Sequence, residues 1–199
     1  MTSIAGIVLA AGLSRRLGRP KQLLVLDDRA LVAHVADRAL ASTLDEVIVV
    51  TGASAAEIRE AIGDRTVRFV HNPDFERGQG TSLAAGIAAL GEAVDATVIL
   101  LGDQPGIAPE TIDRVIGARR ETIAPVIMAR YGDQQGHPVL FGREVFTDLM
   151  RLDGDTGGRE IVRAHREALV LVDGGADAPP PDVDTEEAWD ALRRGWKTD

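Results

Sequence analysis

The chain has 199 residues, of which 45% are hydrophobic, 27% charged and 4% aromatic, so it is a folded protein with an aliphatic core rather than a disordered chain. This length is within reach of one hydrophobic core, and we expect a single domain over residues 1–199. The formal net charge of −9 would repel a nucleic-acid backbone, so we expect no nucleic-acid partner, and any bound phosphate must meet a local cluster of cations.

Short aliphatic segments alternate with helical patterns along the chain. Strands are predicted at 4–10, 46–50, 67–70, 97–101, 125–131, 137–141 and 168–172, and helices at 30–42, 54–62, 81–90, 109–120, 143–151 and 158–166. Several strands are apolar at consecutive residues, which indicates helices on both faces of the sheet. The pattern predicts a three-layer α/β/α fold with a mostly parallel sheet and ligands at the carboxyl ends of its strands.

The strands at 125–131 and 137–141 are separated only by GDQQG, which is typical of an antiparallel hairpin. We therefore expect a mixed sheet. The segment GGADAPPPDVD (174–184) predicts an extended strap that is too short to separate two domains. A final amphipathic helix should follow the strap, with Trp189, Leu192 and Trp196 on its apolar side.

The absence of cysteine excludes disulfides, thiolate metal sites and a cysteine nucleophile, and it suits a reducing cytoplasm. No apolar run approaches the roughly 20 residues that cross a bilayer, and no basic segment precedes the first apolar stretch. We expect a cytoplasmic protein with no membrane partner. The histidines lack HxH or HExxH spacing, so no zinc site is expected, and we interpret His34 and His165 as structural or surface residues.

Positive charge is concentrated directly after the first strand, in VLAAGLSRRLGRPKQLL (8–24). Gly12 and Gly18 enclose LSRRL, and the cations of this loop are Arg15, Arg16, Arg19 and Lys21. A glycine-bearing loop at a strand end presents backbone N–H groups and cations to phosphate oxygens. The loop matches neither GxxxxGK[ST] nor GxGxxG. A plain strand-to-helix connection with solvated arginines is the alternative interpretation.

The segment LAAGLSRRLGRPK resembles the LAAGxSxRMGxxK signature of the nucleotidyltransferases related to the molybdopterin guanylyl- and cytidylyltransferases, with Leu17 at the usual methionine. The resemblance implies a Rossmann-like nucleotidyltransferase fold whose first loop surrounds the triphosphate of an NTP. The residues implied in nucleotide binding are Leu9, Ala10, Ala11, Gly12, Ser14, Arg16, Gly18 and Lys21. Arg16 and Lys21 are also implied in catalysis, where they would stabilise the departing pyrophosphate.

Asp103 follows an apolar strand in TVILLGDQPGI, where α/β folds place catalytic or metal-binding groups. A carboxylate there could bind Mg²⁺ together with substrate phosphates. Asp-Gln-Pro-Gly is also ordinary turn chemistry. The resemblance of LxGDQP to the family's metal-binding aspartate favours a metal-binding and catalytic Asp103, and it places Gln104 and Pro105 beside the acceptor substrate.

A second metal-binding aspartate should come from elsewhere, and the resemblance of the DVD segment to a late D-[IV]-D segment implies Asp184. Asp184 followed by Glu187 also suits the N-terminal cap of the last helix, and the two roles are compatible.

The remaining segments complete the resemblance. In NPDFERGQGTSLAAGI, Gly80 and Ser82 are implied in nucleobase binding, although Thr81 or Ser82 could simply cap the helix. Segments similar to GxPVLF and GDxGAR, the second with Gly158 where alanine is commoner, imply acceptor contacts by Gly136, His137, Pro138 and Arg159.

The implied reaction is Mg²⁺-dependent transfer of CMP from CTP to a phosphorylated acceptor, with molybdopterin the acceptor and a molybdoenzyme a further partner. Cytosine is favoured over guanine because guanylyl-transferring relatives tend to carry glycine where this chain has Ala11. Two alternatives stay open: an NAD(P)H-dependent reductase of the nicotine-blue type, and a non-catalytic carrier of molybdenum cofactor. A requirement for Asp103 and Mg²⁺ separates transfer from hydride chemistry.

Overall fold

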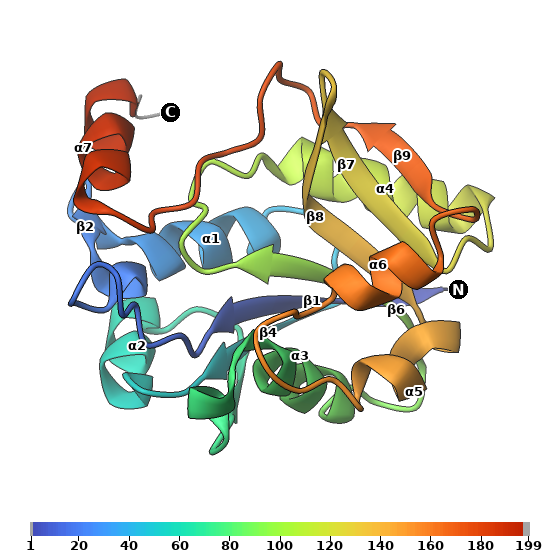
Figure 1. Cartoon of the computed structure of the whole chain (residues 1–199), viewed down its shortest axis with the longest axis horizontal. Coiled ribbons are helices and arrows are strands. Elements are labelled where there is room, and N and C mark those ends of the chain that lie inside the picture. Colours follow the sequence, from blue (N-terminus) through green and yellow to red (C-terminus); the bar gives the residue numbers. More distant parts are fainter. Residues whose placement is uncertain (1, 197–199) are drawn as a thin grey trace.

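Seven strands form one sheet in the computed structural model, which describes residues 2–196 (Figure 1). The strands are β1 (Ser3–Ala10), β4 (Glu46–Thr51), β5 (Arg68–His71), β6 (Val94–Leu101), β7 (Val126–Tyr131), β8 (Gln134–Gly142) and β9 (Val170–Asp173). Their spatial order is β5-β4-β1-β6-β8-β7-β9, and every neighbouring pair is parallel except the two that contain β8. The mixed, mostly parallel sheet expected from the sequence is confirmed.

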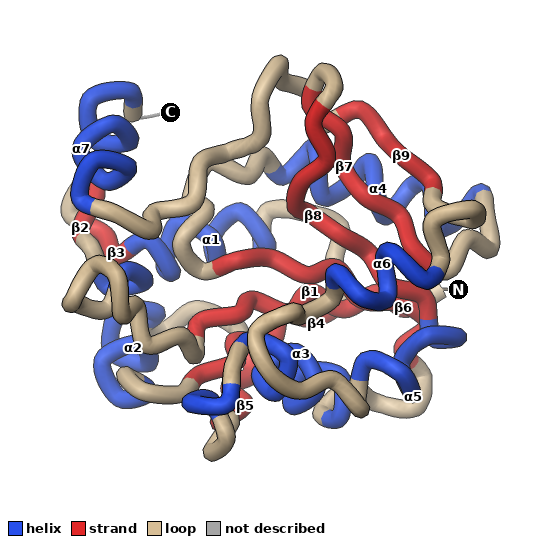
Figure 2. Tube along the Cα trace, viewed as in Figure 1, coloured by secondary structure: helices blue, strands red, loops and turns tan. Residues whose placement is uncertain are grey.

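Helices cover both faces of this sheet (Figure 2). The helices are α1 (Leu31–Leu40), α2 (Ala55–Ile62), α3 (Gln79–Ala88), α4 (Pro109–Glu121), α5 (Phe146–Leu149), α6 (Arg159–Ala164) and α7 (Glu186–Gly195), with 3-10 turns η1 (Lys21–Leu23), η2 (Phe75–Arg77) and η3 (Arg143–Val145). Along β1, Ile4 and Val8 pack with α1, α2 and α4, whereas Ile7 packs with α3, α5 and α6. Alternate strand residues point to opposite faces, and both faces are apolar, which confirms the three-layer architecture.

Three local features differ from the sequence-based expectation. The hairpin turn contains only Gly132 and Asp133, so the next three residues of GDQQG belong to β8. The helix expected at 143–151 divides into η3 and the short α5. A two-stranded ribbon of β2 (Val25–Leu26) and β3 (Arg29–Ala30) was not expected, and the positive φ of Asp27 and Asp28 gives it a tight primed turn.

The neighbouring strands β1 and β6 bring two distant loops together. Leu9 pairs with Leu101, and the N–H of Gly102 donates to the carbonyl of Leu9 at 3.0 Å. A Cβ on Gly102 would lie 3.1 Å from that oxygen, so glycine permits this close approach. The segments that follow these strands, 11–20 and 102–108, therefore start side by side.

A separate apolar cluster attaches α7 beside the first loop. Leu24, Leu26 and Leu31 pack against Val183, Trp189 and Leu192, as the apolar side of the last helix predicted. His34 lies beneath this helix, with its Nε2 2.7 Å from the carbonyl oxygen of Leu26, so its structural interpretation is confirmed. In the stretch from residue 2 to residue 196, no helix has the length and apolarity to cross a bilayer.

We predict that Trp189→Ala lowers the free energy of unfolding by about 3 kcal/mol, because the indole is 6% exposed and its removal leaves a cavity under α7. Urea denaturation measures the effect. Asp190→Ala, at an exposed position of the same helix, should change it by less than about 0.5 kcal/mol. Equal stability of the two variants would show that α7 does not depend on this cluster.

Candidate active site

Ser14 shapes the loop that follows β1. Its φ is +51°, its carbonyl accepts from the N–H groups of Leu17 and Gly18, and its Oγ accepts from the Lys21 N–H at 3.0 Å. Gly18, with φ of +70°, provides the second left-handed residue. The loop thus turns back on itself and brings Lys21, the first residue of η1, to the carboxyl edge of the sheet.

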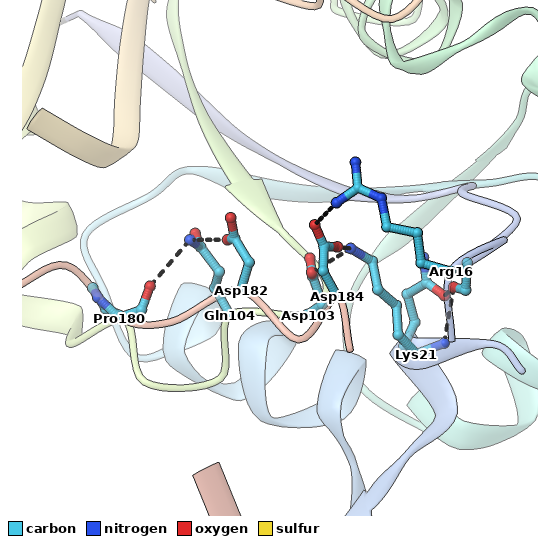
Figure 3. A network of polar contacts seen from close by, with 9 residues as sticks. Arg16, Lys21, Asp103, Gln104, Pro180, Asp182 and Asp184 are labelled. Carbon is cyan, nitrogen blue, oxygen red and sulfur yellow. Dashed lines mark hydrogen bonds and ion pairs between the residues drawn. The ribbon is translucent and has the colours of Figure 1, made fainter. Parts of the chain in front are cut away.

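The ammonium of Lys21 lies between two carboxylates that are far apart in the sequence. Lys21 Nζ is 2.6 Å from Asp103 Oδ2 and 2.6 Å from Asp184 Oδ1. Arg16 Nη1 approaches the other oxygen of Asp184 at 3.1 Å. Figure 3 shows the four side chains converging from the first loop, the end of β6 and the strap. The structure therefore brings together the catalytic and metal-binding residues that the sequence predicted.

Burial and charge oppose each other at this cluster. Asp103 is 4% exposed, and burial raises the pKa of its carboxyl despite the Lys21 ammonium nearby. Burial alone would lower the pKa of Lys21, but Asp103 and Asp184 outweigh it, and the pKa is raised. The hydrogen bond from Lys21 lowers the pKa of Asp184. Asp103 Oδ2 accepts no well-directed hydrogen bond, so only the ion pair compensates its burial.

These carboxylates suit a divalent cation with oxygen ligands. Oxygens of Asp103 and Asp184 already lie around one positive charge. Between residues 2 and 196, no group of three or more His, Cys, Asp or Glu side chains is arranged to hold a metal ion. A magnesium ion bound here would accordingly take two carboxylate ligands from the chain and leave its other positions to water or phosphate.

The extended strap explains how Asp184 reaches Lys21. Val183 is fully buried beside α7, so alternation places Asp182 and Asp184 together on the opposite side. The interpretation of Asp184 as the helix cap is wrong, because α7 is capped by Thr185, whose Oγ1 accepts from the Ala188 N–H at 3.2 Å. The carboxylate of Asp184 faces Lys21 instead.

In the segment predicted to bind the nucleobase, NPDFERGQGTSLAAGI, the helix starts earlier than expected. α3 begins at Gln79, immediately after Gly78, whose φ is +120°, so neither Thr81 nor Ser82 caps it. The buried Ser82 Oγ instead accepts from Asn72 Nδ2 at 3.0 Å. The N–H of Gly80 donates to the Gly154 carbonyl at 2.8 Å, so Gly80 packs against a neighbouring loop.

Residues predicted to contact the acceptor lie in the loop after β6, on β8 and at the start of α6. Gln104 and Pro105 are buried directly after Asp103, and Gly136, His137 and Pro138 lie on β8. His137 Nδ1 is 3.2 Å from the Ile99 carbonyl, so this ring lies against β6. Arg159 is exposed at the start of α6, and its side chain shares no hydrogen bond or ion pair with other described residues. The structure therefore places His137 beside the end of β6, and the charge of Arg159 acts on this ring from α6.

Asp182 and Gln22 are site residues that the sequence interpretation missed. Asp182 Oδ1 accepts from Gln104 Nε2 at 2.5 Å, and the buried Gln22 lies beneath the loop, with its Oε1 3.5 Å from Ser14 Oγ. The alternation of DVD around an apolar residue was the available signal for Asp182. Nothing in the local sequence distinguishes Gln22.

Comparison with known proteins identifies the family. The family model described as a MobA-like NTP transferase domain matches residues 6–169. The chain belongs to the MobA-like NTP transferase family. The structure of Rv0371c from Mycobacterium tuberculosis H37Rv resembles this chain with a TM-score of 0.89 and 36% identity over 98% of each chain. A second structure of Rv0371c, in complex with manganese, has a TM-score of 0.85 and 33% identity over 98% of this chain and 99% of that one.

A curated relative is nicotine blue oxidoreductase from Paenarthrobacter nicotinovorans, which is 31% identical over 92% of this chain and 93% of its own length. A nucleotidyl transferase from Methanothermobacter thermautotroptrophicus, 24% identical over 98% of this chain and 97% of its own, shares the fold with a TM-score of 0.83. The Rossmann-like nucleotidyltransferase fold is thus confirmed. The MobA-like match ends before the strap, so Asp182 and Asp184 lie outside it.

The ion pair of Asp184 predicts a specific dependence of stability on pH. Because Lys21 lowers the folded-state pKa of Asp184, the pair stabilises the protein above the unfolded pKa, and this stabilisation is lost as the pH falls through the folded pKa. The difference in unfolding free energy between wild type and Asp184→Asn should be constant from about pH 8 to 5 and shrink below about pH 4.

Urea denaturation over this pH range measures the difference. The control is Asp190→Asn, at an exposed position of α7 without a side-chain ion pair among the described residues. A difference for Asp184→Asn that grows in acid would contradict the assignment.

Proposed function

We propose that this chain transfers CMP from CTP to a phosphate group of an acceptor such as molybdopterin and releases pyrophosphate. The observation that carries the proposal is the convergence of Lys21 and Arg16 with Asp103 and Asp184 at the carboxyl ends of β1 and β6. A cationic loop beside two carboxylates is what a triphosphate bound together with a divalent cation requires. The product would pass to a molybdoenzyme.

The first loop would bind the triphosphate through its backbone N–H groups at Gly12 and Ser14 and through the side chains of Arg16 and Lys21, while Gly18 allows the loop to turn. An oxygen of the acceptor phosphate attacks the α-phosphorus of CTP, and the bond to the leaving pyrophosphate breaks. Arg16 and Lys21 stabilise the charge that develops on pyrophosphate. The acceptor phosphate is ionised near neutral pH, so the reaction needs no general base.

Asp103 and Asp184 would hold Mg²⁺, which supplies charge neutralisation at the triphosphate oxygens. Lys21 would then be released from the two carboxylates and be available to the phosphates. The structure of Rv0371c in complex with manganese, 33% identical to this chain, supports the binding of a divalent cation.

The cytosine preference rests on Ala11, Gly80 and Ser82. Ala11 is 3% exposed at the end of β1, and its carbonyl lies 2.7 Å from the position of a Cβ on Gly52. The hydroxyl of Ser82 is held in place by Asn72. The methyl group of Ala11, which a glycine would lack, would narrow a base pocket here and favour a pyrimidine over a purine.

The relationship to nicotine blue oxidoreductase favours one alternative, an NAD(P)H-dependent reductase. Hydride transfer would require neither of the two aspartates nor a divalent cation. The metal dependence of the reaction therefore separates the two functions.

Asp103→Asn and Asp184→Asn should each slow pyrophosphate release at least about a hundredfold, because each removes one of two carboxylates that act on the same cation. The double variant should be little slower than the slower single variant, since residues that act as a unit are not additive. Pyrophosphate release from CTP and molybdopterin measures this. Asp184→Asn loses its ion pair but keeps the Thr185 cap of α7, so this variant should still fold. Full activity of that variant would exclude Asp184 from the reaction.

CTP with Mg²⁺ should raise the Tm more than GTP, ATP, UTP or NADPH. A ligand at about 100 times its Kd stabilises by about 2.7 kcal/mol, which corresponds to roughly 5–10 °C at this chain length. The shift should disappear in Asp103→Asn. A larger shift with NADPH, independent of Mg²⁺, would favour the reductase, and a larger shift with GTP would contradict cytosine selectivity.

A further inference from the structure

Gln104 is a buried amide with one satisfied end and one unsatisfied end. The residue is 5% exposed, and its Nε2 donates to Asp182 Oδ1 at 2.5 Å and approaches the Pro180 carbonyl at 3.3 Å. Both partners are acceptors, so the orientation of the amide is determined. Its Oε1 is buried without a hydrogen-bond partner, which costs stability. The same amide that leaves its oxygen unpaired fixes one carboxylate of the strap through its nitrogen.

Asp182 is the carboxylate held in this way. It is exposed, and Figure 3 shows it beside Gln104, next to the cluster of Asp103 and Asp184. Lys21 and Arg16 pair with Asp184, whereas no lysine or arginine between residues 2 and 196 forms an ion pair with Asp182. Asp182 is therefore a fixed, solvent-accessible acceptor group beside the predicted site of transfer.

The surroundings of Asp182 carry further acceptors. His137 Nδ1 faces the Ile99 carbonyl and must be the protonated nitrogen, which leaves Nε2 as a lone-pair acceptor in the neutral ring. Burial lowers the pKa of His137 and keeps the ring neutral, although the charges of Asp182 and Asp103 act in the opposite direction. Since the charges of Asp182 and Asp103 both act on His137, this ring lies near the strap and the end of β6.

The strap lies close to its neighbours through small residues. A Cβ on Gly136 would be 3.0 Å from Pro179, and a Cβ on Gly106 would be 3.4 Å from Pro180. The three prolines at 179–181 keep this segment extended and limit its freedom. Asp182 is thus held by a stiff backbone as well as by Gln104.

We propose that the carboxylate of Asp182 recognises the acceptor substrate through a heterocycle edge with two adjacent N–H donors, a ring N–H beside an exocyclic amino group, and that Gln104 positions this carboxylate. The two oxygens of a carboxylate match two parallel donors, as they do in bidentate pairs with guanidinium. Asp182 touches the substrate and sets its specificity, whereas Gln104 acts through Asp182. The inference rests on the proposed acceptor site and names the chemistry that this site selects.

Binding of pterin and lumazine to the full chain tests the proposal without any transfer reaction. Pterin carries the amino group beside the ring N–H, and lumazine carries an oxo group in its place. Pterin should bind about tenfold more tightly than lumazine in a fluorescence titration, because the oxo group leaves one carboxylate oxygen unpaired. Guanosine and xanthosine form a second pair with the same difference, and comparing the two pairs shows whether a pteridine or a purine ring is preferred.

Asp182→Asn should abolish the preference for pterin over lumazine, since an amide nitrogen replaces one acceptor oxygen while the side chain retains an acceptor for Gln104. Gln104→Leu should reduce the preference severalfold and leave the Tm shift by CTP unchanged, which separates loss of positioning from loss of folding. Asp177→Asn, an exposed strap carboxylate without a side-chain hydrogen bond in the described structure, is the matched control and should bind like wild type.

Equal binding of pterin and lumazine, no binding of either, or a preference that survives Asp182→Asn would overturn the proposal. These results are independent of nucleotidyl transfer. A chain that discriminates pterin from lumazine but shows no CTP-dependent pyrophosphate release would retain this recognition site and lose the proposed reaction. A chain that releases pyrophosphate from CTP but does not discriminate pterin from lumazine would retain the proposed reaction and lose this recognition site.

Discussion

The ammonium of Lys21 joins three segments of the chain at one charged centre. It joins the loop after β1, the end of β6 and the strap before α7 by contacts of 2.6 Å to Asp103 and Asp184. Asp103 is buried, so its negative charge would be costly without this cation. Removing Lys21 would leave that charge uncompensated and would remove the ion pair between the strap and the first loop. The geometry of the candidate site therefore depends on one shared charge.

Apolar packing positions the Lys21 ammonium and its two carboxylates, both from the sheet and from the cluster beside α7. On the sheet, the pairing of β1 with β6 and the absence of a side chain at Gly102 bring the two strand ends into contact. On the other side, Val183 and Trp189 pack into the cluster formed by Leu24, Leu26 and Leu31. The electrostatic contacts of the site are thus held by a hydrophobic frame.

The sequence predicted the layered fold well because apolar strands and amphipathic helices are local signals. The prediction from sequence was wrong where the backbone conformation of one or two residues determines the local structure. Gly78 allows α3 to start at Gln79, and Asp27 and Asp28 form a primed turn without the usual glycine. The loop motif and Asp103 could be found because each lies next to a strand end. The capping role of Asp184 could not be excluded from sequence, since Asp184 and Thr185 are both cap-forming residues and only geometry distinguishes them.

Asp182 shows a different limit of prediction from sequence. Its partner Gln104 is 78 residues away, and neither residue is unusual in its own segment. The same separation has a consequence for the order of folding. All seven strands of the sheet precede Asp182 and Asp184 in the chain, so the sheet can form while Lys21 faces Asp103 alone. A chain at that stage would have its sheet but not its complete site, which closes when α7 packs beside the first loop.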